Sequence, residues 1–183
     1  MNPRRAFATS LVLLALAGRM STAAAEEIVI DFEKAEIGKP TPTWTEKDVV
    51  FKLASAPTKS KAAGRIMFFP HLATNRKGIL NAMATEQAIP VQATFPDSVS
   101  SVTLVLWGST GVPALLEALD GNGAVVDKAS VPAVPGRKTP ADPVPFVELT
   151  VKAPAIAAIR FSGPRDGEFL AADELRFTRT PAN

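Results

Sequence analysis

The sequence predicts an all-β fold, an antiparallel β-sandwich. Three observations carry this prediction. Short apolar or alternating runs recur along the chain, clusters of Gly and Pro separate them, and no stretch keeps a helical period. The cleanest alternation is at 146–152, where Val147, Leu149 and Val151 share one face and polar residues the other.

The expected strands are 28–32, 49–53, 66–69, 89–95, 99–107, 114–119, 124–129, 146–152, 157–161 and 170–177. The strongest hairpin signal is the Asp-Gly-Asn-Gly sequence at 120–123, because Gly and Asn accept the positive φ of a tight turn. Residues 76–88 are the one stretch after the N-terminal segment that could be helical. The segment 131–145 holds five prolines, so we expect a surface connection there rather than a central strand.

The N-terminal segment 1–25 has the features of an export signal. Arg4 and Arg5 precede a short apolar run at 11–17, and the small residues at 23–25 fit a cleavage site. The run is shorter than the roughly 20 residues that span a bilayer. We therefore expect cleavage after Ala25, a single domain at 26–183, and a periplasmic or secreted location. The arginine pair followed by Phe7 partly fits the twin-arginine route, but the general secretory route is favoured.

Composition excludes several functions. The segment 1–25 contains three of the 20 basic residues and no acidic ones, so 26–183 carries 20 − 3 = 17 basic against 18 acidic residues. This balance gives no indication of a nucleic-acid partner. The chain has no cysteine, which excludes disulfides, thiol chemistry and cysteine-based metal sites. No later apolar run is long enough to be a membrane span.

Three groups of segments carry a family resemblance: 30–33 with 38–40 and Trp44, 101–106 with 116–126, and 159–162 with 173–177. They resemble exported bacterial jelly-roll domains of the galactose-binding-like, carbohydrate-binding-module type. The resemblance implies a jelly-roll sandwich with carbohydrate as a ligand class. It also implies that the first and last strands lie side by side.

That adjacency would bring Asp31 or Glu33 close to Asp173 or Glu174. Calcium prefers several hard oxygen ligands, and the resemblance implies a structural calcium ion at this position. The alternative is that these four acids are solvated charges at strand edges, with Glu174 paired to Arg176 or Arg160.

Trp44 and Trp107 are the only tryptophans, and the chain has no tyrosine. Both are candidates for ligand binding, because sugar rings stack on aromatic side chains. The alternative is that both pack in the core. Trp107 is in phase with Thr103 and Val105, so we expect it on the second face of its strand or at a loop mouth.

His71 is the only histidine and a third candidate ligand-binding residue. A single histidine excludes zinc sites that need two or three, and no motif marks a catalytic triad or a carboxylate pair. We therefore expect a non-catalytic binding or interaction module of the cell envelope, whose partner is carbohydrate or another envelope protein. The alternative is a secreted hydrolase with its site in 59–88 around His71. A groove lined by tryptophan would favour binding, and His71 beside a serine and a carboxylate would favour catalysis.

Overall fold

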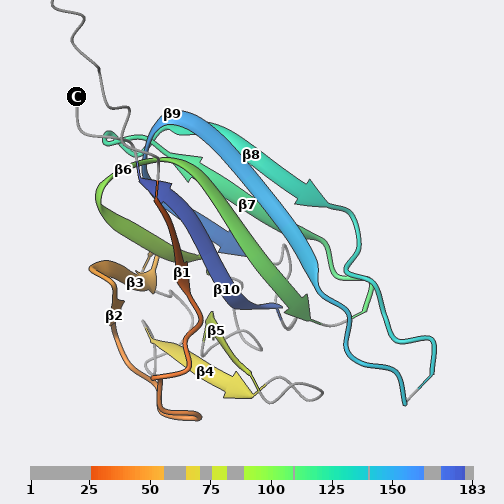
Figure 1. Ribbon diagram of the computed structural model, residues 1–183. Helices are drawn as coiled ribbons and strands as arrows, with labels where there is room; N and C mark the ends of the chain where they lie inside the picture. The colour runs from red at the N-terminus through yellow and green to blue at the C-terminus, as the bar shows by residue number, and fades with distance from the viewer. Residues whose placement is uncertain are drawn as a thin grey trace, which may run out of the picture.

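A computed structural model describes residues 26–55, 65–70, 76–81, 89–108, 110–139, 141–162 and 170–179 (Figure 1). The strands are β1 (Glu27–Ile30), β2 (Trp44–Glu46), β3 (Val49–Leu53), β4 (Ile66–Pro70), β5 (Lys77–Asn81), β6 (Val91–Gly108), β7 (Ala114–Leu119), β8 (Val125–Val131), β9 (Val147–Ser162) and β10 (Leu170–Arg179). All pairings between these strands are antiparallel, and the described residues contain no helix. The predicted all-β antiparallel sandwich is confirmed.

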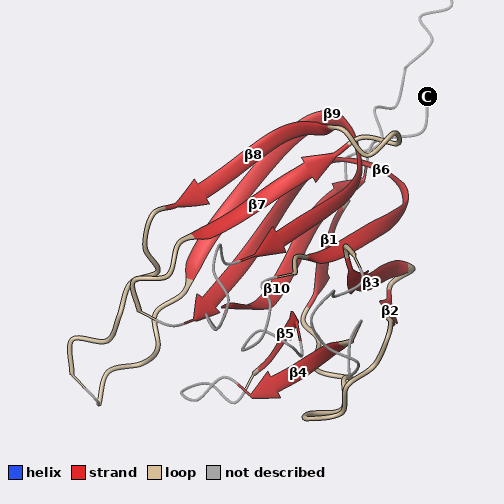
Figure 2. Ribbon diagram, turned by 180° about the vertical axis from the view of Figure 1, so that it is seen from behind, coloured by secondary structure: helices blue, strands red, loops and turns tan. Residues whose placement is uncertain are grey.

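Two long strands, β6 and β9, connect the two layers of the sandwich (Figures 1 and 2). The first part of β6 pairs with β3 and with the end of β9, which also pairs with β7. The second part of β6 pairs with the start of β9 and with β10. Register shifts between Thr94 and Ser101 mark the bend in β6. A strand that bends in this way can leave one sheet and enter the other, closing the sandwich at a corner.

The first and last strands lie side by side, as the resemblance implied. β1 pairs with β10, with Ile30 opposite Leu175. β5 pairs further along β10, where Ala172 lies opposite Ile79. On the β6 side of β10 the register shifts between Ala172 and Glu174, so Asp173 is the extra residue of a β-bulge. Bulges redirect side chains, and this one lies where β1, β5 and β10 meet.

The core is apolar and contains phenylalanines from across the chain. Phe32 and Phe51 are fully buried, with ring centroids 5.3 Å apart in an edge-on arrangement. Phe95 and Phe177 close another part of the core at 5.0 Å. Aromatic pairs at these separations contribute about 0.5–1.5 kcal/mol beyond the area they bury. The alternation predicted at 146–152 holds, because Leu149 and Val151 are buried there.

The predicted hairpin is confirmed as β7–β8. The Asp120 carboxylate accepts hydrogen bonds from the backbone N–H groups of Asn122 and Ala124, both at 2.9 Å. Gly123 has a φ of 81°, which glycine adopts without steric cost. The turn therefore forms from its own side chains and backbone, which explains why it could be identified locally.

The stretch 76–88, which the sequence left open as a possible helix, is a strand in its described part. Residues 77–81 form strand β5, paired with β4 along its whole length, and 82–88 lie outside the described residues. Ile79 of β5 and Ile66 of β4 are both fully buried, so pairing and burial decide the conformation here rather than local propensity. The sequence also gave no sign of β2, which has only three residues. The sequence predicted two strands in place of each of β6 and β9, because prolines fall near the bends of these long strands.

Candidate ligand-binding site

Trp107 lies on the outer face of its sheet, as its phase predicted. It is opposite Ala171 of β10 in the ladder. Both belong to a small apolar cluster separate from the main core, against which Phe69, Val144 and Phe146 pack. Only 5% of Trp107 is exposed, so this second cluster, rather than solvent, surrounds most of the indole.

Gly78 of β5 makes room for the Trp107 ring. A Cβ atom placed on Gly78 would lie 3.0 Å from the indole Nε1 and 3.2 Å from the Cβ of Ala171. These separations are shorter than ordinary van der Waals contacts, so a larger residue would displace the indole or the strand. This role of Gly78 was not predictable from the sequence, because the spacing between β5 and β6 depends on tertiary structure.

The proline-rich connection between β8 and β9 (Figure 2) contributes Pro135, Arg137 and Pro145 to a cavity beside Trp107. Val134 is 1% exposed, and its N–H donates to the Val112 carbonyl at 2.7 Å. Its own carbonyl accepts from the Gly111 N–H at 2.9 Å. These two bonds fix the loop directly before 135–137. The expectation of a surface connection at 131–145 is confirmed for its described residues, and the loop is anchored at one buried side chain.

This cavity has a volume of about 580 Å³, and we call it the Trp107 cleft. Its lining is two aromatic side chains, three prolines and a few polar or small residues: Phe69, Pro70, Trp107, Gly108, Thr110, Pro135, Gly136, Arg137, Val144 and Pro145. Small-molecule sites typically have this size and a largely apolar lining with a few polar groups. Arg137 and Thr110 are the polar side chains among the described residues of this lining.

A second cavity, of about 400 Å³, contains the other tryptophan, and we call it the Trp44 cavity. Its described lining is rich in cations: Lys34, Glu36, Lys39, Pro40, Thr41, Pro42, Trp44, Arg65 and Phe68. Trp44 is partly buried against the main core, and its ring meets Phe68 edge-on with centroids 5.2 Å apart. Each tryptophan therefore packs against apolar residues and also lines a cavity.

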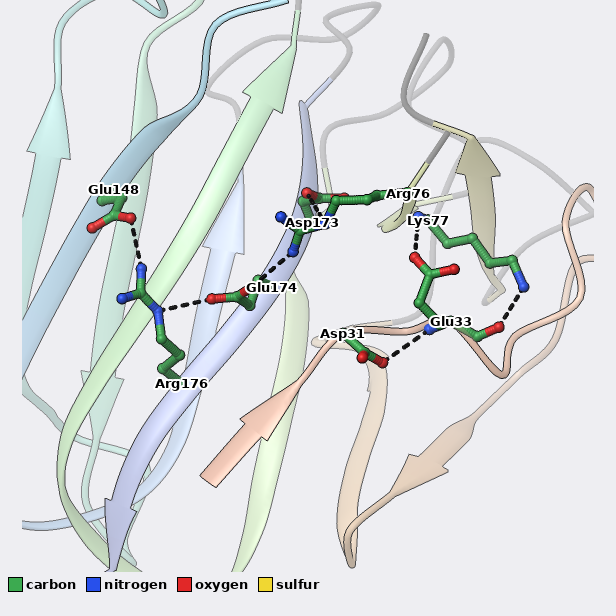
Figure 3. Close-up of polar contacts among 8 residues, drawn as sticks. All are labelled: Asp31, Glu33, Arg76, Lys77, Glu148, Asp173, Glu174 and Arg176. Carbon is green, nitrogen blue, oxygen red and sulfur yellow. Dashed lines mark hydrogen bonds and ion pairs between the residues drawn. The ribbon is translucent and has the colours of Figure 1, made fainter. Parts of the chain in front are cut away.

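Asp173 and Glu174 of β10 form an ion-pair network with arginines of β10 and of the segment before β5 (Figure 3). Asp173, at the bulge, is fully buried, and its Oδ2 lies 3.1 Å from Arg76 Nε. Another nitrogen of Arg76 lies 2.8 Å from Glu174 Oε2. Glu174 also pairs with Arg176 at 2.9 Å, as the sequence suggested, and Arg176 reaches Glu148 at 2.6 Å.

Asp31 and Glu33 use their carboxylates elsewhere. Glu33 Oε1 accepts a hydrogen bond from the backbone N–H of Lys77 at 3.0 Å, and the Lys77 ammonium donates to the Glu33 carbonyl (Figure 3). Asp31 Oδ1 accepts from the Glu33 N–H at 3.2 Å. Glu33 is close enough to Asp173 for its charge to raise the pKa of that carboxyl, while the described partners of Asp31 and Glu33 are backbone N–H groups.

Burial raises the pKa of the Asp173 carboxyl to about 6. The positive charge of Arg76 lowers this pKa, while the negative charges of Glu174 and Glu33 raise it. Desolvation has the largest effect on this pKa. Water stabilises a charged carboxylate, and the buried Asp173 carboxyl loses that stabilisation.

The calcium site remains a prediction. In the part of the chain that the structure describes, no group of three or more His, Cys, Asp or Glu side chains is arranged to hold a metal ion. The Arg76 guanidinium occupies the position between Asp173 and Glu174 where a cation would balance their charge.

The hydrolase alternative depends on His71, which lies outside the described residues. Arg76, from the same segment, is engaged with Asp173 and Glu174. Glu117, the acid inside an apolar strand, pairs with Arg160 on the neighbouring strand at 2.5 Å. The described residues include a tryptophan-lined cavity, the feature set out above as favouring binding, while the surroundings of His71 lie outside them.

None of the described segments forms a helix long and apolar enough to cross a membrane.

No protein-family model matches the sequence, and no curated protein matches it. The structure is similar to the K2 cleaved adhesin domain of Lys-gingipain (Kgp), with a TM-score of 0.53 and 14% identity over 84% of this chain and 99% of that one. It is also similar to TmCBM61, solved in complex with β-1,4-galactotriose, with a TM-score of 0.44 and 14% identity over 81% and 94% of the two chains. A third similar structure is CsCBM6-3 from Clostridium stercorarium in complex with cellobiose, with a TM-score of 0.39 and 10% identity over 70% and 88%.

At these identities the likeness concerns the fold. The three structures named above are an adhesin domain and two carbohydrate-binding modules. The resemblance found in the sequence is confirmed at the level of architecture, because the adhesin domain shares the fold of this chain over 99% of its own length.

Proposed function

We propose that this protein is an exported, non-catalytic carbohydrate-binding module and that the Trp107 cleft is its binding site. The observation that carries the proposal is the cleft itself. Its size falls within the range of small-molecule sites, and Trp107 and Phe69 line it together with a fixed proline-rich loop.

The cleft matches the chemistry of a neutral sugar. One face of a pyranose ring presents C–H groups, which pack on aromatic and proline surfaces, while its hydroxyls need donors and acceptors. Arg137 supplies several N–H donors, and Thr110 supplies a hydroxyl that both donates and accepts. The walls are held by strand pairing and by the backbone bonds of Val134, so little ordering is needed when a ligand binds.

The described lining also supports binding without catalysis. Hydrolysis of a glycosidic bond generally uses two carboxyl groups on either side of it. No acidic residue and no histidine is among the described residues that line the Trp107 cleft. A sugar in this cleft would be held without a described acid or base to act on it.

The export part of the proposal depends on the N-terminal signal. Mass spectrometry of protein recovered outside the cytoplasm should give an N-terminus at Glu26, because Ala23 and Ala25 satisfy the small-residue requirement of the signal peptidase. Recovered protein that still contains Arg19 would contradict this cleavage site.

The binding test is a glycan array followed by titration calorimetry on residues 26–183. Neutral oligosaccharides, with β-1,4-galactotriose and cellobiose among them, should give a signal. Arg137→Ala should then weaken binding about tenfold or more, since hydrogen bonds to a charged group contribute about 1.5–3 kcal/mol.

The matched control is Lys138→Ala, an exposed cation next in the chain that is not part of the described lining. It should leave the affinity unchanged. An array without signal for any neutral glycan, or equal losses in both variants, would contradict the proposal. Release of reducing sugar from a bound glycan would contradict its non-catalytic part.

A further inference from the structure

The Trp44 cavity is distinguished by its charge. Its described lining contains Lys34, Lys39 and Arg65 against one acid, Glu36. The local charge is therefore 3 − 1 = +2, in a domain whose residues 26–183 carry 17 basic and 18 acidic groups. This excess belongs to the cavity and does not follow from a basic protein surface.

The one acid in the lining is already paired. Glu36 lies 2.8 Å from Lys39, and both side chains are largely exposed. This ion pair lowers the pKa of the Glu36 carboxyl through its hydrogen bond with Lys39, so Glu36 is ionised at neutral pH. The remaining positive charge comes from Lys34, which precedes the loop 37–41 in the chain, and from Arg65, which directly precedes β4.

The wall is fixed before any ligand binds. The Gly38 N–H donates to the Phe68 carbonyl at 2.9 Å, and Thr41 and Ile66 exchange two backbone hydrogen bonds at 2.9 and 2.8 Å. These bonds hold the loop 37–41 against strand β4. A preformed wall reduces the entropy that a ligand loses in ordering its site.

Arg65 is oriented by the same loop. Its Nη1 donates to the Pro40 carbonyl at 3.3 Å, which uses one of the five N–H donors of the guanidinium. The planar fork of a guanidinium matches a carboxylate in two parallel hydrogen bonds. Trp44 lies in the same cavity and offers aromatic surface to an apolar ring face.

We propose that the Trp44 cavity is a second binding site, specific for a sugar ring that bears a carboxylate. The carboxylate lies against Arg65 and Lys34, and the apolar face of the ring packs on Trp44. The two sites divide by charge, since Arg137 is the one charged residue in the described lining of the Trp107 cleft. This site is independent of the proposed function, because it uses a different cavity and a different class of sugar.

The test is calorimetric titration of residues 26–183 with trigalacturonate and with its fully methyl-esterified form, which keeps the rings and removes the charges. We expect trigalacturonate to bind and the ester to bind at least tenfold more weakly. Arg65→Ala should weaken trigalacturonate binding about tenfold or more, the effect of losing hydrogen bonds to a charged group. Trp44→Leu, which keeps an apolar side chain against the core, should weaken it as well.

Two controls locate the effect. Lys128→Ala removes an exposed cation of β8 that is not part of the described lining, and Arg137→Ala removes the cation of the Trp107 cleft. Neither should change trigalacturonate affinity, and thermal melts should show that all variants fold. Absence of trigalacturonate binding overturns the proposal. So does an equal loss in Lys128→Ala, which would indicate diffuse attraction, or a loss in Arg137→Ala alone, which would assign the acidic sugar to the Trp107 cleft.

Discussion

The two tryptophan cavities have similar parts and different surroundings. Phe68 and Phe69 are successive residues of β4, and strand geometry directs them to opposite faces. Phe68 belongs to the main core and lines the Trp44 cavity, whereas Phe69 packs with the separate Trp107 cluster. One strand thus supplies an aromatic side chain to each site.

The difference between the sites lies in the loops beside them. The proline-rich loop beside Trp107 contributes one lining cation, Arg137. The loop beside Trp44 contributes two, Lys34 and Lys39, and Arg65, directly before β4, adds a third. In the two proposals, aromatic residues would provide the surface for sugar rings at both sites, and loop charge would decide which sugars each site accepts.

The largest expected difference between the two sites is in stability, and Trp107→Ala should reveal it. Because the indole is 95% removed from solvent, its loss should reduce the free energy of unfolding by about 3–5 kcal/mol. Trp44→Ala should cost less, since that ring is only partly buried. Urea unfolding of both variants measures the difference, and equal losses would show that the two tryptophans are not packed as described.

The second expected effect is a pH dependence of the free energy of unfolding, caused by the carboxyl of Asp173. The pKa of this carboxyl is about 6 in the folded protein against an ordinary value of 3.8. Below about pH 4 the group is protonated in both states, and its contribution to stability is complete. As the pH rises toward 6 the unfolded chain releases the proton first, so the free energy of unfolding falls by an amount on the order of 3 kcal/mol.

Asp173→Asn should remove this pH-dependent part of the free energy of unfolding, while Arg76 keeps its pairing with Glu174. The measurement is the free energy of unfolding of both proteins between pH 4 and pH 7. The wild type should lose stability relative to the variant across that window. A constant difference between them would mean that Asp173 does not titrate there.

The third expected effect is a loss of ligand binding at one cavity and not at the other, caused by a substitution at Gly78. Gly78→Ala places a Cβ close to Trp107 Nε1 and Ala171, and overpacking of this kind typically costs about 1–3 kcal/mol. We expect weaker binding of neutral sugar at the Trp107 cleft and unchanged trigalacturonate binding at the Trp44 cavity. Titration of both ligands checks this, and parallel losses would indicate that the sites are coupled.

The smallest expected effect is the change in stability when calcium is added. An extracellular-type site with a dissociation constant near 1 mM would add about 1 kcal/mol of stability at 5 mM calcium. Because Arg76 already pairs with Asp173 and Glu174, we expect a smaller effect. Thermal melts in 5 mM calcium and in EDTA, repeated on Asp173→Ala, test this. A full shift that disappears in the variant would establish the predicted calcium site.

Local patterns predicted much of the sandwich. The turn at 120–123 forms from its own side chain and glycine, and the alternation of β9 follows from its one buried face. Strand β5 could not be predicted, because its conformation depends on pairing with β4 and on burial of Ile79.

The sites were predictable only in part. Phase placed Trp107 on the outer face, and the adjacency of the chain ends placed Asp173 near Glu33. The Arg76 ion pairs, the close approach of Gly78 and the anchoring of the loop by Val134 were not predictable. Each depends on residues far apart in sequence that only the folded chain brings together.

The most direct test of the central claim uses Trp107 as its own reporter. Trp44→Phe leaves Trp107 as the single tryptophan of the chain, so its fluorescence reports on one cleft. If neutral sugars bind at the Trp107 cleft, that emission should show a saturable change when the neutral oligosaccharide with the strongest array signal is added, and Arg137→Ala should abolish the change. Emission that stays constant while calorimetry records binding would place the neutral-sugar site elsewhere and contradict the account.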